Sequence, residues 1–416
     1  MAEKLLSRAC GRLVKGGDIV ICRPDFAMGT DGSIPMAIDY LHSIADPSRG
    51  PIDPKQLVFA FDHYGALSGP GALRLQEKAR EFALAFGVPL FDVGEGIGHQ
   101  LMIEEGFAAP GRLVVGADSH ATAYGALNCF GAGIGSSDLA GIMLTGQLWL
   151  ETPRSIRVEL RGELQPFVSA KDIALYLARI LRADGANYRA IEFAGDGVAH
   201  LDLDERIVLS NMAVELGAKA GIFPADETLA RFLTAESRDR SQTVAPDPGC
   251  EYVQEVTVEL GSLRPQIALP HRVDNVVDLD DAETTPVDVV YLGTCTGGRI
   301  RDYEEALEVI RAAGRVAQGV EVVVTPATRR INQELRERGM LDEFRRYGAR
   351  LESPGCGACC GTCGTVLPGQ VIMSSANRNF KGRMGDATAR IFLGSSYSCA
   401  MAAVEGVVGR RTKGAS

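Results

Sequence analysis

Cysteines gather in one short segment, SPGCGACCGTCGT (residues 353–365), which holds four of the chain's ten cysteines within eight positions. Cys356 and Cys359 form a C-x-x-C pair in a glycine-rich loop, and Cys295 lies far upstream in GTCTGGR. Three thiolates from two loops suit a cubane iron–sulfur cluster in which one iron lacks a protein ligand. Such an iron can act as a Lewis acid on a substrate oxygen, whereas full four-cysteine ligation is typical of electron transfer.

The same thiols allow two other interpretations. A zinc site built from Cys356, Cys359, Cys360 and Cys363 is one, although its spacing is cramped compared with two separated zinc knuckles. A thioredoxin-like redox pair is the other, although no convincing helix follows the loop. Ligand spacing favours the cluster and leaves the zinc site and the redox pair as alternatives.

Three of the six histidines stand beside acidic or glycine-rich neighbours. His63 follows Asp62, His99 lies in GEGIGHQ, and His120 ends the segment GADSH. Imidazole titrates near neutral pH and a carboxylate can orient it, so these histidines are candidates for proton transfer. A structural role is the common alternative for any single histidine.

Two arginines follow the cysteine segment, in SANRNFKGRMG. Arg378 and Arg383 lie five positions apart, and guanidinium groups bind carboxylates through paired hydrogen bonds. A solvated basic loop is the alternative. The segment GAGIGSSD lacks the final glycine of a dinucleotide fingerprint and the lysine of a P-loop, so we expect no nucleotide site.

Short runs rich in β-branched residues alternate with amphipathic stretches along the chain. The alternation predicts an α/β fold with largely parallel sheets. The expected buried strands are residues 18–23, 56–61, 112–117, 287–293 and 320–327. The clearest helical periodicity lies in residues 72–86 and 302–313.

Several of these strands end on reactive side chains. The side chains at the strand ends are Asp62, His63, Asp118, Ser119, His120 and Cys295. Ligand sites in open α/β sheets lie outside the carboxyl ends of the strands. We therefore expect these residues to meet in one cleft.

The chain has 416 residues and a formal net charge of −10. This chain is longer than a domain with one hydrophobic core usually is. Shifts in composition predict three α/β domains at 1–153, 154–275 and 276–416. Lysines and arginines are scattered without the basic stripe of a nucleic-acid binder, so we expect no nucleic-acid partner.

The first residues, MAEKLLSRACGRLVKGGD, contain no apolar core of a secretory signal. The chain also has no apolar run of roughly 18 residues or more, the length that spans a bilayer. We expect a cytoplasmic location, no membrane partner and reduced cysteines, which favours metal-binding or catalytic thiols over disulfides.

Nine segments, in order along the chain, resemble the landmarks of the aconitase superfamily. They are EKLLSRACGR, FDH, GEGIGHQ, VVGADSHATAYGALNCFGAGIG, IEFAGDG, LSNMAVELGAKAGIF, GTCTGGR, PGCGAC and NRNFKGRMG. The resemblance covers nearly the whole chain, and the long GADSH and NRNFKGR segments are highly specific. It implies three α/β domains of the aconitase type surrounding a 4Fe–4S cluster.

The resemblance also implies residue roles. The cluster ligands would be Cys295, Cys356 and Cys359, with one iron open. Acid–histidine pairs would form between Asp62 and His63, Asp118 and His99, and Glu192 and His120. The residues expected to bind or face the substrate are Asp31, Ser119, Arg378 and Arg383.

The implied activity is that of a hydro-lyase that isomerises a 2-hydroxy di- or tricarboxylate by dehydration and rehydration. The first substrate choice is 2-isopropylmalate, converted to 3-isopropylmalate as in leucine biosynthesis. Homoaconitase-type substrates and methylmalate or dimethylmalate are the alternatives. Within this scheme His63, oriented by Asp62, would protonate the leaving hydroxide.

Two departures from the family pattern affect these expectations. Cys360 and Cys363 crowd the ligand loop where relatives carry other residues. The fourth, swivelling domain of aconitases, which carries the serine that removes the substrate proton, has no counterpart in this sequence. We therefore expect a heterodimer with a small subunit that supplies that domain and its serine, and no activity without it.

Two functional classes are alternatives to a hydro-lyase: an RNA-binding protein and a zinc hydrolase. One branch of the superfamily binds RNA in its cluster-free form, but the acidic net charge disfavours this function. A zinc hydrolase is the second class, and a colourless preparation that contains zinc instead of iron would favour it.

Overall fold

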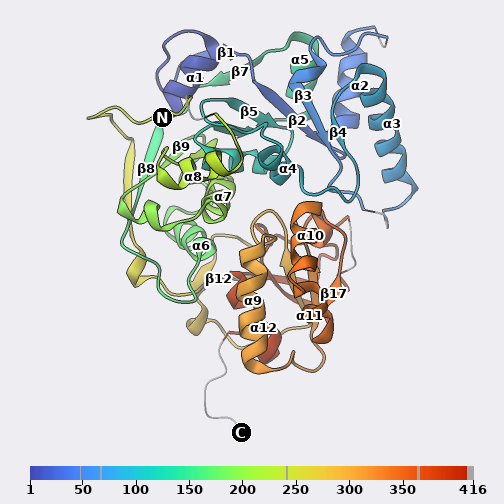
Figure 1. The fold of residues 1–416 in the computed structure, drawn as a ribbon, viewed down its shortest axis with the longest axis vertical. Coiled ribbons are helices and arrows are strands. Elements are labelled where there is room, and N and C mark those ends of the chain that lie inside the picture. Colours follow the sequence, from blue (N-terminus) through green and yellow to red (C-terminus); the bar gives the residue numbers. More distant parts are fainter. Residues whose placement is uncertain (47, 66–67, 240–241, 363–365, 410–416) are drawn as a thin grey trace.

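The computed structural model describes the chain except for residues 47, 66–67, 240–241, 363–365 and 410–416. The described residues form three main β-sheets and two small two-stranded ribbons. Figure 1 shows each main sheet with its helices as a separate lobe, the three lobes meeting near the middle of the molecule.

The first sheet has five parallel strands in the order β4-β3-β2-β5-β6. The strands are β2 (Phe26–Thr30), β3 (Leu57–Ala60), β4 (Leu90–Phe91), β5 (Leu113–Gly116) and β6 (Phe130–Gly133). Its helices are α1 (Ala2–Cys10), α2 (Ile34–Ile44), α3 (Pro70–Phe86), α4 (Gly98–Glu104) and α5 (Ser136–Thr145). β3 and β5 are buried along their whole length, as continuous apolar runs in a parallel sheet predict.

The second sheet has four parallel strands in the order β10-β9-β8-β11. The strands are β8 (Ser155–Arg161), β9 (Ala190–Ala194), β10 (Ala220–Ile222) and β11 (Gln254–Glu259). Its helices are α6 (Ala170–Leu181), α7 (Leu203–Met212) and α8 (Glu227–Ala235).

The third sheet is mixed, with seven strands in the order β13-β12-β19-β18-β15-β16-β17. The strands are β12 (Gln266–Ala268), β13 (Val276–Asp278), β15 (Val289–Gly293), β16 (Glu321–Thr325), β17 (Arg350–Leu351), β18 (Val371–Ser374) and β19 (Arg390–Leu393). β12 runs antiparallel to both of its neighbours, and the other pairings are parallel. Its helices are α9 (Ile300–Ala313), α10 (Arg329–Glu337), α11 (Met340–Arg346) and α12 (Ser396–Glu405).

The expected strand at residues 18–23 is present but is not a buried strand of a parallel sheet. It forms β1 (Ile19–Cys22), which pairs antiparallel with β7 (Leu148–Glu151). Alternate residues of β1 are exposed, because the ribbon has only one covered face. The second ribbon joins β14 (Thr285–Pro286) to β20 (Val407–Val408).

The hydrophobic cores do not follow the three sheets one to one. Buried side chains of the second sheet and of one face of the third sheet form a single core, which includes Phe193, Phe223, Tyr291 and Ile372. A second core lies around Phe59 and Phe130 of the first sheet and also includes Ala190, Ala220 and Ile222 of the second sheet. β12 pairs with β13 and β19, so the third sheet begins before the boundary predicted at residue 275. The three-domain division stays a prediction.

Within the part of the chain that the structure describes, no helix combines the length and the apolar character needed to cross a membrane.

Candidate active site

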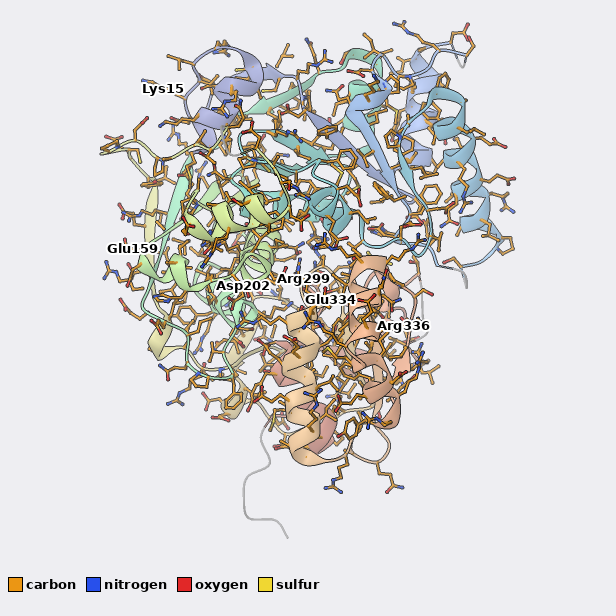
Figure 2. All side chains as sticks on the ribbon, viewed as in Figure 1. Lys15, Glu159, Asp202, Arg299, Glu334 and Arg336 are labelled. Carbon is orange, nitrogen blue, oxygen red and sulfur yellow. The ribbon has the colours of Figure 1, made fainter. Side chains whose placement is uncertain are left out.

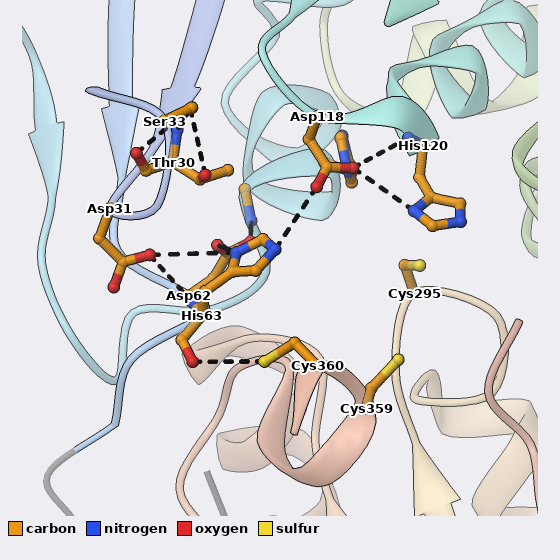
Figure 3. A network of polar contacts seen from close by, with 12 residues as sticks. Thr30, Asp31, Ser33, Asp62, His63, Asp118, His120, Cys295, Cys359 and Cys360 are labelled. Carbon is orange, nitrogen blue, oxygen red and sulfur yellow. Dashed lines mark hydrogen bonds and ion pairs between the residues drawn. The ribbon is translucent and has the colours of Figure 1, made fainter. Parts of the chain in front are cut away.

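The chemically reactive side chains lie at strand ends, as the sequence predicts. Asp31 follows β2, Asp62 and His63 follow β3, and Asp118 follows β5. These three strands are neighbours in one parallel sheet, so their carboxyl ends share one edge. Cys295 follows β15 of the third sheet and faces this edge from the opposite side in Figure 3.

Three carboxylates surround the His63 ring, and the most distant is Asp31, whose Oδ1 lies 3.9 Å from Nδ1. His63 Nδ1 is 2.6 Å from Asp62 Oδ1, and its Nε2 is 3.4 Å from Asp118 Oδ2. Burial alone would lower the pKa of His63, but the charge of Asp62 and hydrogen bonds to Asp118 and Asp62 outweigh it and raise the pKa well above its usual value. His63 is therefore held as an imidazolium, the form that can donate a proton.

Asp118 is the hub of the histidine cluster. Its Oδ1 lies 2.8 Å from His99 Nε2 and accepts a hydrogen bond of 2.9 Å from the backbone N–H of His120. Burial would raise the pKa of Asp118, but the hydrogen bonds from His120, His63 and His99 lower it well below its usual value. The carboxylate thus stays ionised and fixes several rings at once.

His99 is oriented at both ring nitrogens. Because Nε2 faces the ionised Asp118, it carries a proton, and Nδ1 then accepts a hydrogen bond of 3.1 Å from the Tyr124 hydroxyl. His99 is in the first turn of α4, and Tyr124 is in the 3₁₀ helix η2 (Ser119–Leu127), for which Asp118 is the N-cap. The predicted pairing of Asp118 with His99 is present.

The predicted pairing of Glu192 with His120 is wrong. His120 Nε2 lies 2.9 Å from Glu215 Oε1, which also accepts a hydrogen bond of 2.7 Å from Arg378 Nε. Although burial raises its pKa, contacts with His120 and Arg378 lower the pKa of Glu215. Glu215 thereby joins a histidine of the first sheet to an arginine of the third.

Glu192 is buried in β9 and serves another purpose. Its Oε1 accepts hydrogen bonds from the Ser155 hydroxyl (2.8 Å), the Ala2 backbone N–H (3.0 Å) and the Met1 ammonium (2.7 Å). Glu192 therefore joins α1 to the second sheet, away from the histidines. Glu215 lies in η4 (Ala213–Leu216), the 3₁₀ turn that follows α7, and nothing in its local sequence indicates a contact with His120.

Asn377 links two of the three predicted cluster cysteines. Its Nδ2 lies 3.2 Å from Cys295 Sγ, and its Oδ1 lies 3.6 Å from Cys359 Sγ. The Arg383 guanidinium is 3.6 Å from Cys359 Sγ, through Nη2. Cys356 Sγ lies within 4.8 Å of ligand atoms of Asp62 and His63. The cysteines thus sit between the histidine cluster and the arginine segment.

Burial raises the pKa of the Cys295 and Cys356 thiols. For Cys295 the pKa is raised to about 12, with desolvation as the largest cause and the charge of Cys359 adding to it. Cys356 is shifted in the same direction, for the same leading reason. Buried thiols with a raised pKa are neutral, and they become ligands when a metal group takes the place of their protons. The described cysteines are all free thiols.

Several buried polar atoms in this region lack a hydrogen-bond partner among the described residues, and they include Asn211 Nδ2 and Arg383 Nε. Asn211 Oδ1 accepts a hydrogen bond of 3.2 Å from Asn377 Nδ2. Native proteins rarely leave such groups unsatisfied. The donor set, three thiols with amide and guanidinium groups around them, fits an anionic cluster that carries a bound carboxylate.

Cys360 does not point toward the other cysteines. In Figure 3, Cys359 points toward Cys295, whereas Cys360 points toward the main chain of His63. Its Sγ lies 3.3 Å from the His63 carbonyl oxygen and 2.8 Å from Thr362 Oγ1. This orientation argues against the four-cysteine zinc site. Cys363 lies outside the described residues.

Asp31 was expected to line the cleft, but it has no exposed surface. Its carboxylate accepts hydrogen bonds from the backbone N–H groups of His63 (3.1 Å) and Tyr64 (3.0 Å) and from Gln76 Nε2 (2.9 Å). Asp31 therefore fixes the His63 segment from behind. Ser119 is partly exposed beside Asp118, and its contact with substrate stays a prediction.

The sequence is similar to those of known proteins along most of its length. Residues 73–286 and 280–406 match the aconitase family (aconitate hydratase). The chain is 40% identical over 412 residues to 3-isopropylmalate dehydratase large subunit 1 of Thermotoga maritima, covering 98% of this chain and 97% of that protein. It is 39% identical over 412 residues to the homoaconitase large subunit of Thermus thermophilus, covering 98% and 96%.

A solved structure supports the fold. Holo aconitase X of Thermococcus kodakaraensis superposes with a TM-score of 0.52 at 12% identity, covering 89% of this chain and 88% of that chain. This likeness concerns the arrangement of helices and strands alone.

Proposed function

Because the chain belongs to the aconitase family, we propose that it is the large subunit of a hydro-lyase that isomerises a 2-hydroxy di- or tricarboxylate, with 2-isopropylmalate as the preferred substrate. The observation that carries this proposal is the meeting of the Asp62–His63 pair, the Asp118 cluster and the cysteine loop in one site. The names of the relatives support the choice of substrate and the alternative of homocitrate-type acids.

Cys295, Cys356 and Cys359 would hold a 4Fe–4S cluster with one iron open. The cluster would supply a Lewis-acidic iron that polarises the C–O bond of the substrate hydroxyl. The contacts of Asn377 and Arg383 with two of these sulfurs support the assignment, since hydrogen bonds to cluster sulfurs are a known way of tuning such groups.

His63 would donate the proton that turns the leaving hydroxide into water. Asp62 holds Nδ1, so Nε2 carries the proton to be transferred, and Asp118 lies 3.4 Å from that nitrogen. Hydroxide is a poor leaving group without a proton, and a positioned acid contributes typically 10²- to 10⁴-fold, as a rough range. In rehydration the same ring would take the proton back.

Arg378 and Arg383 would bind the substrate carboxylates. The contact of Arg378 Nε with Glu215 fixes the guanidinium plane and leaves its terminal nitrogens for a ligand. The unpartnered Nε of Arg383 supports a carboxylate contact at that residue. A fixed pair of guanidinium groups would keep the reacting carbons aligned with His63.

The proposed partner is a small subunit that carries the swivel domain and the serine base. The names of both relatives contain the words "large subunit", which supports a two-subunit enzyme. Free thiols in the described residues suit a reducing compartment, and we place the enzyme in the cytoplasm.

The proposal is tested by reconstituting the chain anaerobically with iron and sulfide, adding its small subunit, and assaying isopropylmalate, homocitrate and methylated malates in parallel. We expect isopropylmalate to give the highest kcat/KM and the large subunit alone to be inactive. Preference for homocitrate would establish the alternative substrate. Failure of every hydroxy acid in the loaded two-subunit enzyme would refute the proposal.

A further inference from the structure

Lys171 is a buried ammonium group in contact with the loop that carries Cys295, and no step of the proposed reaction uses it. The residue is in the first turn of α6, which begins at a capping box between Ser169 and Asp172. Its Nζ donates three hydrogen bonds of 2.8 Å, to Thr296 Oγ1 and to the carbonyl oxygens of Ser375 and Ala376. Only 3% of its surface is exposed.

The three acceptors belong to two separate loops of the third sheet. Thr296 follows Cys295 directly, and Ser375 and Ala376 directly precede Asn377. The loops also contact each other, because Thr296 Oγ1 donates to the Ser375 carbonyl oxygen over 2.9 Å. Lys171, which belongs to the second sheet's helices, therefore fixes the spacing between a predicted cluster ligand and the asparagine that contacts it.

All three hydrogen bonds of Lys171 Nζ go to neutral oxygens, one hydroxyl and two carbonyls. Its neighbour Asp172 instead accepts hydrogen bonds from the backbone N–H groups of Gln266 and Ser169, at 2.7 and 2.8 Å. Burial lowers the pKa of Lys171 to about 8, and the Cys295 charge acts against that shift. A buried ammonium group whose acceptors are all neutral has lost the solvation that it has in water.

A nearby arginine shows the contrasting arrangement. Arg299 Nη2 donates to the Cys295 carbonyl oxygen over 2.9 Å, while its Nε lies 3.4 Å from Asp204 Oδ1. Figure 2 places Arg299 at the junction between the second lobe and α9. Arg299 has an acidic partner within ion-pair distance, whereas the charges that act on Lys171 are those of Cys295, Cys399, Asp302 and Cys359.

We propose that Lys171 is a positioning residue that holds the Cys295 loop against the Asn377 loop and supplies a buried positive charge that balances the thiolate-bound cluster. The electrostatic half of this inference rests on the proposed function, and the positioning half does not. The physical reason for both is that one ammonium group bonds to the Thr296 hydroxyl of one loop and to the Ser375 and Ala376 carbonyl oxygens of the other, with Cys295 first among the charges that act on it.

The positioning half is tested on the cluster-free full-length chain by amide hydrogen exchange. Lys171→Met should speed exchange in segments 293–299 and 374–379 while leaving the first sheet protected. Lys219→Met is the matched control, because Lys219 is also largely buried but donates to the Gly133 carbonyl oxygen, away from the cysteines. Unchanged exchange in both segments of the Lys171 variant would overturn the positioning role.

The electrostatic half is tested on the anaerobically reconstituted chain. We expect Lys171→Met to lose iron to a chelator about 10- to 100-fold faster than wild type, the usual effect of removing an outer contact of a metal site. Its reduction potential should become more negative, because a nearby cation favours the reduced, more anionic cluster. Thr296→Val, which removes one acceptor and no charge, should leave the potential unchanged.

Lys171→Gln separates the two roles and replaces the methionine variant if the latter does not fold. Glutamine keeps two donors, so loop protection should be largely retained while the potential still shifts negative. A glutamine variant with the wild-type potential would overturn the electrostatic role. Absence of iron and sulfide in the reconstituted wild-type chain would refute the cluster proposal, and hydrogen exchange would then still decide the positioning role.

Discussion

The candidate site has a histidine half, at the edge of the first sheet, and a cysteine half, in the loops of the third sheet. The two halves differ in whether their polar groups have partners within the protein. On the edge of the first sheet, His63, His99 and His120 each have a carboxylate partner between 2.6 and 2.9 Å from a ring nitrogen. In the loops of the third sheet, buried thiols lie together and Arg383 Nε lacks a partner among the described residues. The ring nitrogens of the histidine half have carboxylate partners within the protein, whereas the cysteine half has thiols that could hold a metal group.

The largest expected effect breaks the cysteine half. Cys295→Ser should lose the cluster and reduce turnover to background, because the remaining thiols cannot supply the third ligand. Cys360→Ala is the matched control and should retain iron and activity within about twofold, since its sulfur contacts the His63 carbonyl oxygen instead of the other cysteines. Iron analysis and an anaerobic assay decide. Cluster loss in the Cys360 variant and retention in the Cys295 variant would mean that the ligand set is wrong.

The next effect breaks the histidine half while leaving the cysteines intact. His63→Gln should lower kcat by about 10²- to 10⁴-fold with normal iron content, the usual contribution of a general acid. His200→Gln, at a half-exposed surface histidine near Glu163, is the control and should retain wild-type rates. Retained turnover in the His63 variant would show that another group protonates the leaving hydroxide.

A smaller effect tests the residue that joins the two halves. Glu215→Gln should reduce kcat/KM by about 100-fold, because His120 and Arg378 both lose an anionic partner that fixes them. Glu192→Gln should leave the kinetics of the folded enzyme unchanged and lower the free energy of unfolding by about 1–3 kcal/mol. Normal kinetics in the Glu215 variant with reduced kcat/KM in the Glu192 variant would support the pairing of Glu192 with His120 that the sequence predicted.

The smallest effect is a pH dependence of stability. The pKa of Glu215 is lowered in the folded chain, so its contacts stabilise the fold above the ordinary carboxyl pKa of about 4.3. That contribution is lost as the pH falls through the lower folded pKa. Urea unfolding of wild type and Glu215→Gln should therefore give a constant difference near neutral pH that shrinks on acidification. A difference that grows with acid would contradict the assignment.

The strands and several of the site contacts could be predicted from residues because their signals are local. Continuous apolar runs marked β3, β5, β15 and β16, and the reactive residues that follow β3 and β5 meet at one sheet edge. The prediction that residues 18–23 form a buried strand was wrong, because an edge ribbon and a buried strand are both rich in β-branched residues.

Contacts between lobes could not be read in the same way. Glu192 and Glu215 both lie in segments that resemble the family, and only tertiary packing shows which of them reaches His120. Lys171 gave no signal, because a lysine in a first helical turn is ordinarily solvated, and its burial depends on two loops more than a hundred residues away. Asp31 was expected at the surface of the cleft because sequence does not reveal which strand-end acids turn inward.

The proposed function depends on a three-cysteine cluster with one open iron, and Mössbauer spectroscopy tests for that cluster most directly. The chain would be reconstituted anaerobically with ⁵⁷Fe and sulfide and measured with and without isopropylmalate. We predict one iron subsite that differs from the others and whose signal changes when the hydroxy acid is added. Iron subsites that are all insensitive to the acid, or a colourless chain that retains zinc, would contradict the account.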